Sequence, residues 1–211
     1  MEIFYFALLV VLAFWLGACP FSLWVGKWLL GKDIRDYGDG NPGATNVLRA
    51  GGRKAFVLAL FLDMGKGVPL VALAHYYFEL PMAMVMAVGL SAILGHAFTP
   101  MLRFNGGKAL AVMGGVMIGL PQHEIFFALV IFMLLGFLLI DIDAWRVMFG
   151  TTATLIYLVV TKGLSLEPLF MLCVIAILVV KHFDDLKTRP RLKGKLITWF
   201  RGRKAASLGR S

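Results

Sequence analysis

The chain has 211 residues, of which 60% are hydrophobic and only 16% are charged, and its mean hydropathy is +0.83. This composition excludes an ordinary soluble domain, which needs far more charge to cover its surface, and is typical of an integral membrane protein. The net charge is +9, but ten of the 21 lysines and arginines lie between Lys181 and Arg210. A basic segment beside a membrane span indicates contact with anionic headgroups rather than with nucleic acid.

Apolar segments follow one another along the chain. They cover residues 3–30, 55–78, 82–98, 109–120, 125–140, 147–161 and 164–181. A complete crossing needs about 20 apolar residues. The fourth and fifth segments are shorter than this, so they are expected to be tilted or partly re-entrant. The sequence predicts an all-α integral membrane protein with about seven transmembrane helices; six helices and one re-entrant segment are the alternative.

Lysine and arginine are concentrated in alternate connectors. If the 31–54 connector is cytoplasmic, the connectors of that side contain Lys32, Arg35, Arg49, Arg53, Lys54, Arg103, Lys108, Arg146 and the basic end of the chain. The connectors of the other side contain only Lys162. Because cytoplasmic connectors carry the excess of basic residues, we expect the N-terminus outside and the C-terminus in the cytoplasm.

The end of the chain has the pattern of a helix that lies on a membrane. Leu192, Leu196 and Phe200 recur at helical spacing among basic residues, as in interfacial amphipathic helices. Each basic residue near the surface adds roughly 1 kcal/mol of attraction to anionic lipid. We therefore expect two parts: a membrane domain over residues 1–186 and a basic amphipathic cytoplasmic tail over residues 187–211.

The connector after the first apolar segment is rich in glycine and in hydrogen-bond donors. Its glycines permit positive φ, and Pro42 fixes a turn. Successive free backbone N–H groups in such a loop form a concavity that binds anions. The side-chain donors are Asn41, Thr45, Asn46 and Arg49, and the last can bind a phosphate through two N–H groups. The pattern predicts a phosphate-binding loop, with an ordinary Gly/Pro connector as the alternative.

A second glycine-rich connector precedes the fourth apolar segment. Gly106, Gly107 and Lys108 stand where a helix is expected to begin, which resembles a phosphate seat at a helix N-terminus. The predicted topology places this connector on the same side as the first one. His96, at the end of the third segment, either contacts the site or is a hydrogen-bonded structural residue.

Ionisable residues also occur within the apolar segments. Asp63 and Lys66 are three residues apart and so share a helical face. Because charge at this depth is costly, either they form a structural pair or Lys66 holds an anionic ligand. In another connector, Asp141 and Asp143 are expected to form a solvated turn rather than a metal site.

The last apolar segment ends with His182 and Asp185, again three residues apart. The carboxylate can accept a hydrogen bond from one imidazole nitrogen, which would fix the tautomer and raise the basicity of the other nitrogen. A histidine oriented in this way can act as a general base towards a hydroxyl group. A polar helix end that faces headgroups is the alternative.

The run Gly40-Asn-Pro-Gly-Ala-Thr-Asn-Val-Leu-Arg49 is a highly specific sequence motif. With Leu62-Asp-x-x-Lys-Gly67, Gly95-His-x-Phe98 and Phe104-x-Gly-Gly-Lys108, it resembles the bacterial acyl-phosphate:glycerol-3-phosphate acyltransferase family, PlsY, over nearly the whole chain. The resemblance implies a seven-helix enzyme of the bacterial cytoplasmic (inner) membrane with its active site facing the cytoplasm. It implies transfer of an acyl group from acyl phosphate to the 1-hydroxyl of glycerol 3-phosphate. The products would be lysophosphatidate and phosphate, and neither a metal nor coenzyme A would be needed.

The motifs and the resemblance together define an expected site. Its catalytic residues are His182, Asp185 and Lys108. Its substrate-binding residues are Asp39, Gly40, Asn41, Gly43, Thr45, Asn46, Arg49, Lys66, His96, Gly106 and Gly107. Membrane lipids are the other expected partners, and no nucleic acid is expected.

The chain also departs from the family pattern. The family usually has serine at the position of Asp39, asparagine at that of Asp185 and arginine at that of Phe183. Its second motif usually reads Lys-Gly-Gly-Lys-Gly, where this chain has Asn105-Gly-Gly-Lys-Ala109. A serine-rich element usually follows the position of Arg146, where this chain continues as Val147-Met-Phe-Gly-Thr-Thr152. Together these changes remove two cations and add two anions.

A carboxylate about 4 Å from a phosphate costs several kcal/mol at an effective dielectric constant near 20. Asp39 therefore either points away, is protonated, binds a cation, or indicates an altered acceptor. Two further hypotheses follow from these changes. One is a catalytically divergent homologue that binds or transports an anionic lipid or acts as an assembly partner. The other is a metal-assisted transferase that uses Asp39, Asp141, Asp143 and Asp185.

Overall fold

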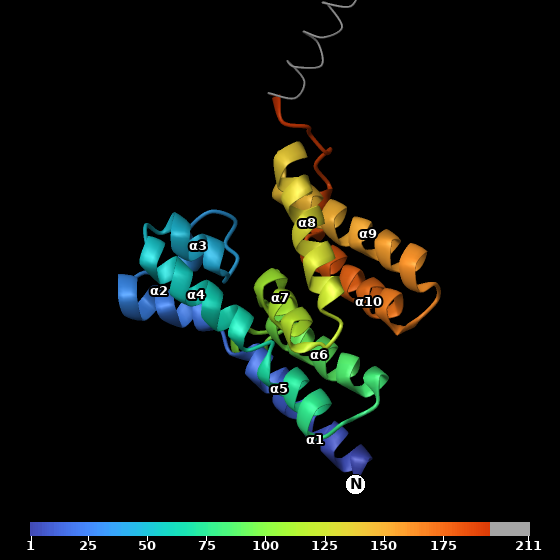
Figure 1. The fold of residues 1–211 in the computed structure, drawn as a ribbon. Coiled ribbons are helices and arrows are strands. Elements are labelled where there is room, and N and C mark those ends of the chain that lie inside the picture. The colour runs from blue at the N-terminus through green and yellow to red at the C-terminus, as the bar shows by residue number, and fades with distance from the viewer. Residues whose placement is uncertain (195–211) are drawn as a thin grey trace, which may run out of the picture.

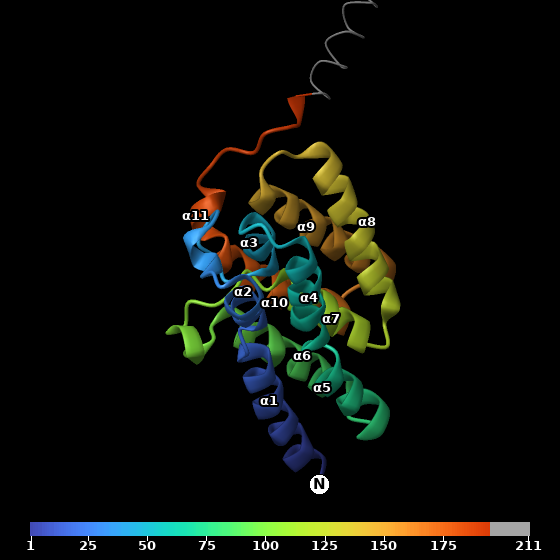
Figure 2. The ribbon, with the colours of Figure 1, turned by 90° about the vertical axis from the view of Figure 1, so that its left-hand side faces the viewer.

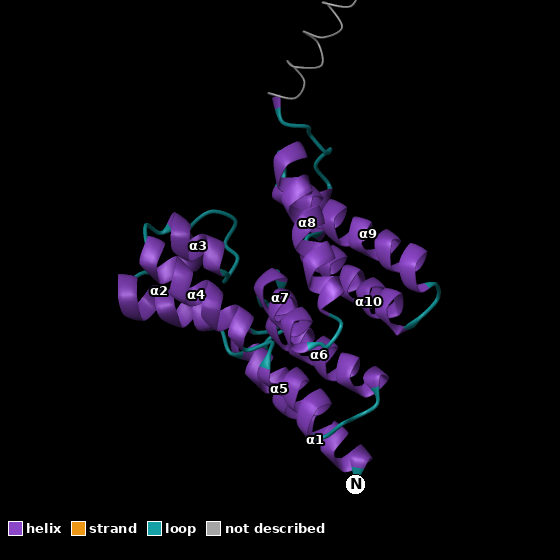
Figure 3. Ribbon diagram, in the orientation of Figure 1, coloured by secondary structure: helices purple, strands orange, loops and turns teal. Residues whose placement is uncertain are grey.

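The structure, a computed structural model, describes residues 1–194 and is helical over most of this range (Figure 3). The α-helices are α1 (Glu2–Ala18), α2 (Phe21–Leu30), α3 (Ala44–Arg49), α4 (Arg53–Gly65), α5 (Pro69–Ala72), α6 (Met82–Ala97), α7 (Leu110–Gly119), α8 (His123–Leu139), α9 (Asp143–Lys162), α10 (Leu166–Lys181) and α11 (Phe183–Leu186). Short 3₁₀ turns cover Ile34–Asp36 and Pro100–Leu102, and a π-helical turn, Leu73–Tyr77, continues α5.

Apolar helical segments occupy each of the positions predicted from the sequence. Four of them are long and apolar enough to cross a bilayer: Glu2–Leu30, Arg53–Tyr77, Met82–Leu102 and Asp143–Lys162. By contrast, α7 has 10 residues, so it rises only about 15 Å, half of a hydrocarbon core of about 30 Å. The next helix, α8, has 17 residues. The prediction that the fourth and fifth segments are short is confirmed.

The first apolar segment differs from the prediction because it is divided into α1 and α2. Pro20 has no N–H group and disfavours helical backbone at Cys19, whose ψ is 119°. The break exposes two backbone carbonyls. The hydroxyl of Thr99 donates to the carbonyl of Ala18, and the Lys66 ammonium donates to that of Cys19, both at 2.7 Å. Side chains just after α4 and α6 therefore satisfy the backbone at the break.

The helices form two groups that meet at α6 and α7 (Figures 1 and 2). In the first group, α2, α3 and α4 enclose a small core around Ile34, Val47 and Ala59. In the second group, α9 packs between α8 and α10, and the main core continues from there through α6 and α7 to α1. The two glycine-rich loops lie where the groups approach each other.

The predicted amphipathic tail falls mainly on residues 195–211, which lie outside the described residues. Its beginning differs from the prediction. Leu192 forms an antiparallel bridge with Ile140, and the N–H of Lys193 donates to the carbonyl of Leu139 at 3.0 Å. The expected helix therefore does not begin at Leu192, because the backbone there pairs with the α8–α9 connector.

Candidate active site

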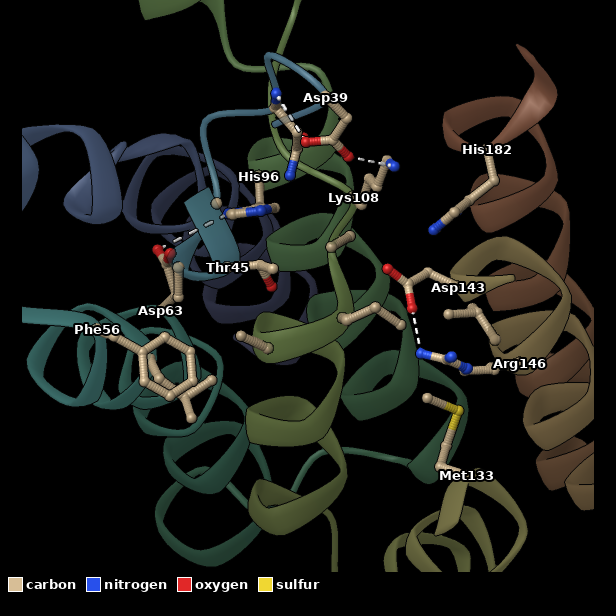
Figure 4. A pocket seen from close by; sticks show the side chains of 18 of the residues that line it. Asp39, Thr45, Phe56, Asp63, His96, Lys108, Met133, Asp143, Arg146 and His182 are labelled. Carbon is tan, nitrogen blue, oxygen red and sulfur yellow. Dashed lines mark hydrogen bonds and ion pairs between the residues drawn. The ribbon is translucent and has the colours of Figure 1, made fainter. Parts of the chain in front are cut away.

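A cavity of about 410 Å³ lies between the two groups of helices (Figure 4). Its polar lining residues are Asp39, Asn41, Thr45, Arg49, Asp63, His96, Lys108, Asp143, Arg146 and His182. Its larger apolar lining residues are Phe56, Leu60, Leu110, Met133, Phe137 and Val147. The polar residues, together called the polar wall, share the cavity with hydrocarbon side chains. This combination fits a ligand with a charged head and an apolar chain.

Lys108 lies at the centre of the polar wall. Its ammonium is 2.7 Å from Asp39 Oδ2 and 2.6 Å from Asp185 Oδ2. Partial burial would lower the pKa of Lys108, but the hydrogen bonds and charges of the two carboxylates outweigh burial and raise it above its ordinary value. The site therefore contains a permanent cation, and that cation has two internal anionic partners.

The other oxygen of Asp39 faces the donors predicted to bind phosphate. Oδ1 accepts a hydrogen bond from the Asn46 side-chain amide at 2.9 Å and lies 3.4 Å from both Arg49 Nη1 and the backbone N of Asn41. Burial would raise the pKa of Asp39, but Lys108 and then Asn46 and the Asn41 backbone outweigh it and hold the pKa below its ordinary value. The predicted donors do come together, and they surround a carboxylate.

Glycines shape the first loop as expected. Gly38 and Gly40, on either side of Asp39, have φ of +61° and +71°, which other residues rarely adopt. A Cβ atom at Gly38 would also collide with the side chains of Arg49 and Asn46. Gly43 has an ordinary φ of −114° and precedes α3, whose first turn carries Thr45 into the cavity lining.

The second loop differs from the predicted helix N-terminus. Gly106 and Gly107 precede α7 in a non-helical segment, and the N–H of Gly107 donates to the carbonyl of His96 at 3.1 Å. A Cβ atom at Gly106 would collide with that carbonyl, and one at Gly107 would collide with the His96 ring. These glycines allow the loop to lie directly on the end of α6. The N–H of Gly107 is already used within the protein.

Ala109 carries backbone strain at the end of this loop. Its φ is +61°, in the left-handed region, where a Cβ atom costs roughly 1–2 kcal/mol. The glycine that the family usually has here would avoid this cost. The substitution of alanine for the usual glycine therefore places a Cβ atom on left-handed backbone.

The predicted pair of His182 and Asp185 is wrong. The ring Nδ1 of His182 is 2.9 Å from the carbonyl of Leu178, and Asp185 bonds to Lys108 instead. A carbonyl only accepts, so Nδ1 carries the proton and Nε2 keeps its lone pair. In Figure 4 the ring points into the cavity. Burial lowers the pKa of His182 below 6.5, and the Leu178 carbonyl offsets this only in part. The ring is a neutral proton acceptor near pH 7.

Lys66 lies outside the lining of this cavity. Its ammonium is 2.8 Å from Asp63 Oδ1, and the hydroxyl of Ser22 donates to the other Asp63 oxygen. His96 Nδ1 lies 4.0 Å from Asp63, and His96 itself lines the cavity. The contacts support the structural pair, one of the two alternatives for Asp63 and Lys66.

Three polar residues of the cavity lining, Asp63, Asp143 and Arg146, were not among the expected site residues. Asp143 was expected in a solvated turn, but it begins α9, pairs with Arg146 and lies 3.9 Å from Arg49 Nη2. Arg146 also donates to the carbonyls of Ile140 and Asp141. The i, i+3 spacing of an aspartate and an arginine at a predicted cytoplasmic helix start was an available signal. Among residues 1–194, no three acidic, histidine or cysteine side chains are grouped to hold a metal ion.

Comparison with known proteins identifies relatives of this chain. The chain matches the family model for glycerol-3-phosphate acyltransferase over residues 7–189. It is 35% identical over 187 residues to the glycerol-3-phosphate acyltransferase of Lactococcus lactis, across 88% of this chain and 87% of that one. The corresponding protein of Geotalea daltonii is 39% identical over 187 residues, across 85% of this chain and 91% of its own.

Two solved structures have the same fold. They are the glycerol 3-phosphate form and the lysophosphatidic acid form of PlsY, an integral membrane glycerol 3-phosphate acyltransferase. Their TM-scores are 0.78 and 0.77, their identities are 29% and 28%, and each alignment covers 92% of this chain and 98% of the other. The resemblance found in the sequence is confirmed. Because the match extends over most of the chain, this protein belongs to the glycerol-3-phosphate acyltransferase family.

Proposed function

We propose that this membrane enzyme, which transfers an acyl group to glycerol 3-phosphate in phospholipid synthesis, takes that group from an acyl phosphate. The observation that carries the proposal is the mixed lining of the cavity, which is both cationic and apolar. Arg49 and Lys108 line it, and so do hydrocarbon side chains such as Phe56 and Phe137. Cationic and N–H donors suit the phosphate groups of both substrates, and the apolar side chains suit the acyl chain.

The proposed step uses His182 as the proton acceptor. The 1-hydroxyl oxygen of glycerol 3-phosphate attacks the acyl carbonyl carbon, and its proton passes to His182 Nε2. The bond between the acyl carbon and the phosphate oxygen then breaks, and inorganic phosphate leaves with the bonding electrons. Donors of the polar wall stabilise the negative charge that develops on the carbonyl oxygen. Leu178 orients the imidazole, because its carbonyl holds the Nδ1 proton.

The proposal includes a placement in the membrane. Seven crossings, with the N-terminus outside and the C-terminus inside the bacterial cytoplasmic membrane, would put both glycine-rich loops on the cytoplasmic side. The excess of basic residues in the connectors of that side supports this orientation. Residues 187–211 would then supply a basic segment beside the inner leaflet, following the membrane domain of residues 1–186.

A direct assay tests the donor. Purified full-length protein in detergent is incubated with glycerol 3-phosphate and an acyl phosphate, and both phosphate release and lysophosphatidate are measured. Acyl-coenzyme A replaces the acyl phosphate in a parallel reaction. We expect stoichiometric products with acyl phosphate only; turnover with acyl-coenzyme A alone would contradict the proposal.

Two arms address the alternatives. Binding of lysophosphatidate without turnover of either donor would favour the divergent lipid-binding homologue. Turnover that is lost on treatment with a strong chelator and restored by a divalent cation would favour the metal-assisted transferase.

A further inference from the structure

The carboxylate of Asp39 already occupies the place where the polar wall gathers its donors. It contacts Lys108, Arg49, the Asn46 amide and the backbone N–H of Asn41. These are the groups that the sequence predicted would bind phosphate. An incoming phosphate must therefore share these donors with Asp39 or displace it.

The surroundings of Asp39 permit displacement. The residue is half-exposed and lies between two glycines of positive φ, Gly38 and Gly40. A second cavity, of about 240 Å³, lies beside it and shares Asp39, Asn41 and Lys108 with the main one. A rotation within the loop can therefore move the carboxylate without displacing a packed helix.

We infer that Asp39 is a specificity-determining residue that acts as an internal competitor for the phosphate-binding donors. The inference rests on the proposed use of Lys108 and Arg49 to hold substrate phosphate. A phosphate dianion offers more charge and more acceptor oxygens than a carboxylate, so it can replace Asp39. A carboxylate ligand has no such advantage over a tethered group of the same chemistry, because tethering gives Asp39 a high effective concentration.

Asp185 has a smaller part in this competition. It contacts Lys108, where Asp39 contacts Lys108 and three further donors. Removing the charge of Asp39 leaves Lys108 with one carboxylate and removes the nearest anion from Arg49 and Asn46. These two residues then keep only weaker or neutral partners: Arg49 lies 3.0 Å from Asn46 Oδ1 and 3.9 Å from Asp143, and Asn46 donates to the Asn41 carbonyl. Removing the charge of Asp185 leaves all four contacts of Asp39 in place.

The test compares Asp39→Asn and Asp39→Ser with Asp36→Asn, a matched control that removes an exposed aspartate of the same connector outside both cavities. Inorganic phosphate is the probe. Its Kd is measured by calorimetry on the purified full-length proteins, and its inhibition constant is measured against glycerol 3-phosphate.

Both Asp39 variants should bind inorganic phosphate about tenfold more tightly, as expected for loss of a nearby half-exposed negative charge. Asp185→Asn should lower the Kd about threefold, and Asp36→Asn should leave the Kd unchanged. The KM for glycerol 3-phosphate should fall with the Kd in both Asp39 variants.

Unchanged or weaker phosphate binding in both folded Asp39 variants would overturn the inference. An equal gain in phosphate affinity in Asp36→Asn would also overturn it, because the effect would then follow from the net charge of the connector and not from the position of Asp39. Failure of the proposed function looks different, because wild-type protein would then release no phosphate from acyl phosphate while the calorimetric comparison could still be made.

Discussion

Two lysine–aspartate contacts in this molecule have opposite characters. Lys66 and Asp63 are almost completely buried, and each has further partners within the protein: the Cys19 carbonyl for the lysine and the Ser22 hydroxyl for the aspartate. Lys108, whose side chain is 21% exposed, meets Asp39 and Asp185 at the wall of a cavity. The first contact stabilises the break between α1 and α2, and only its aspartate reaches the cavity lining. The second contact faces, with both its lysine and Asp39, space that a ligand can enter.

The comparison shows why sequence spacing alone could not assign these residues. Asp63 and Lys66 have the i, i+3 spacing of a pair, and so do His182 and Asp185. The first pair forms and the second does not. Asp185 instead accepts a hydrogen bond from Lys108, and His182 bonds to the carbonyl of Leu178. Burial and competing partners decide the outcome, and both depend on segments that are distant in the sequence.

The largest effect is expected from Asp63→Asn. This change leaves the Lys66 charge buried without its partner, which typically costs about 3–5 kcal/mol. The midpoint of thermal unfolding in detergent should fall sharply. Asp184→Asn, which removes an exposed aspartate paired with Lys187, is the matched control and should leave it unchanged. An equal midpoint in both variants would contradict a structural role for the buried pair.

Lys108→Ala should lower activity rather than stability, the reverse of the effect expected for Asp63→Asn. Loss of a positioned charge at the site should lower kcat/KM about 10²–10³-fold, while the unfolding midpoint changes little because the side chain is partly exposed. Lys54→Ala removes a lysine outside the main cavity and should retain activity. If Lys108→Ala unfolds as readily as Asp63→Asn does, the distinction between the two contacts is wrong.

The pH dependence of activity tests the assignment of His182. The base must be neutral to accept a proton, and burial holds its pKa below 6.5. Activity should therefore be full near pH 7 and fall as pH decreases through that lowered pKa. His182→Gln should lower kcat about 10²-fold and remove this acid limb.

Asp185→Asn separates the observed geometry from the pairing expected from the sequence. Because Asp185 bonds to Lys108 rather than to the imidazole, the acid limb should stay nearly in place in this variant. A fall of the apparent pKa by a full unit or more would show that Asp185 supports the histidine directly.

The smallest effect is expected from Ala109→Gly. Relief of the left-handed backbone at this position should stabilise the fold by about 1 kcal/mol, seen as a small rise of the unfolding midpoint. Ala87→Gly, within the regular helix α6, should have the opposite sign and a similar size. A loss of stability in Ala109→Gly would contradict the strain.

Much of the architecture was readable from the sequence. Hydropathy located the apolar segments, and glycine, amide and basic residues located the two loops that meet at the cavity. The break at Pro20 could have been predicted, because a proline lies inside the apolar run. The run was instead interpreted as one segment because its length suits a complete crossing. The sequence could not show that the N–H of Gly107 donates to the carbonyl of His96, because that contact depends on how the loop folds back over α6.

The hydrogen bond from Lys181 Nζ to the carbonyl of Gly106, 2.9 Å long, has a consequence for how such a chain can vary over evolution. Lys181 adjoins His182, and Gly106 stands two residues before Lys108. The bond therefore fixes the proposed base relative to the cation directly, without relying on the lengths of the helices between them. Insertions in the connectors at 120–122 or 163–165 should leave the two groups in register, so length variation in this family should collect there.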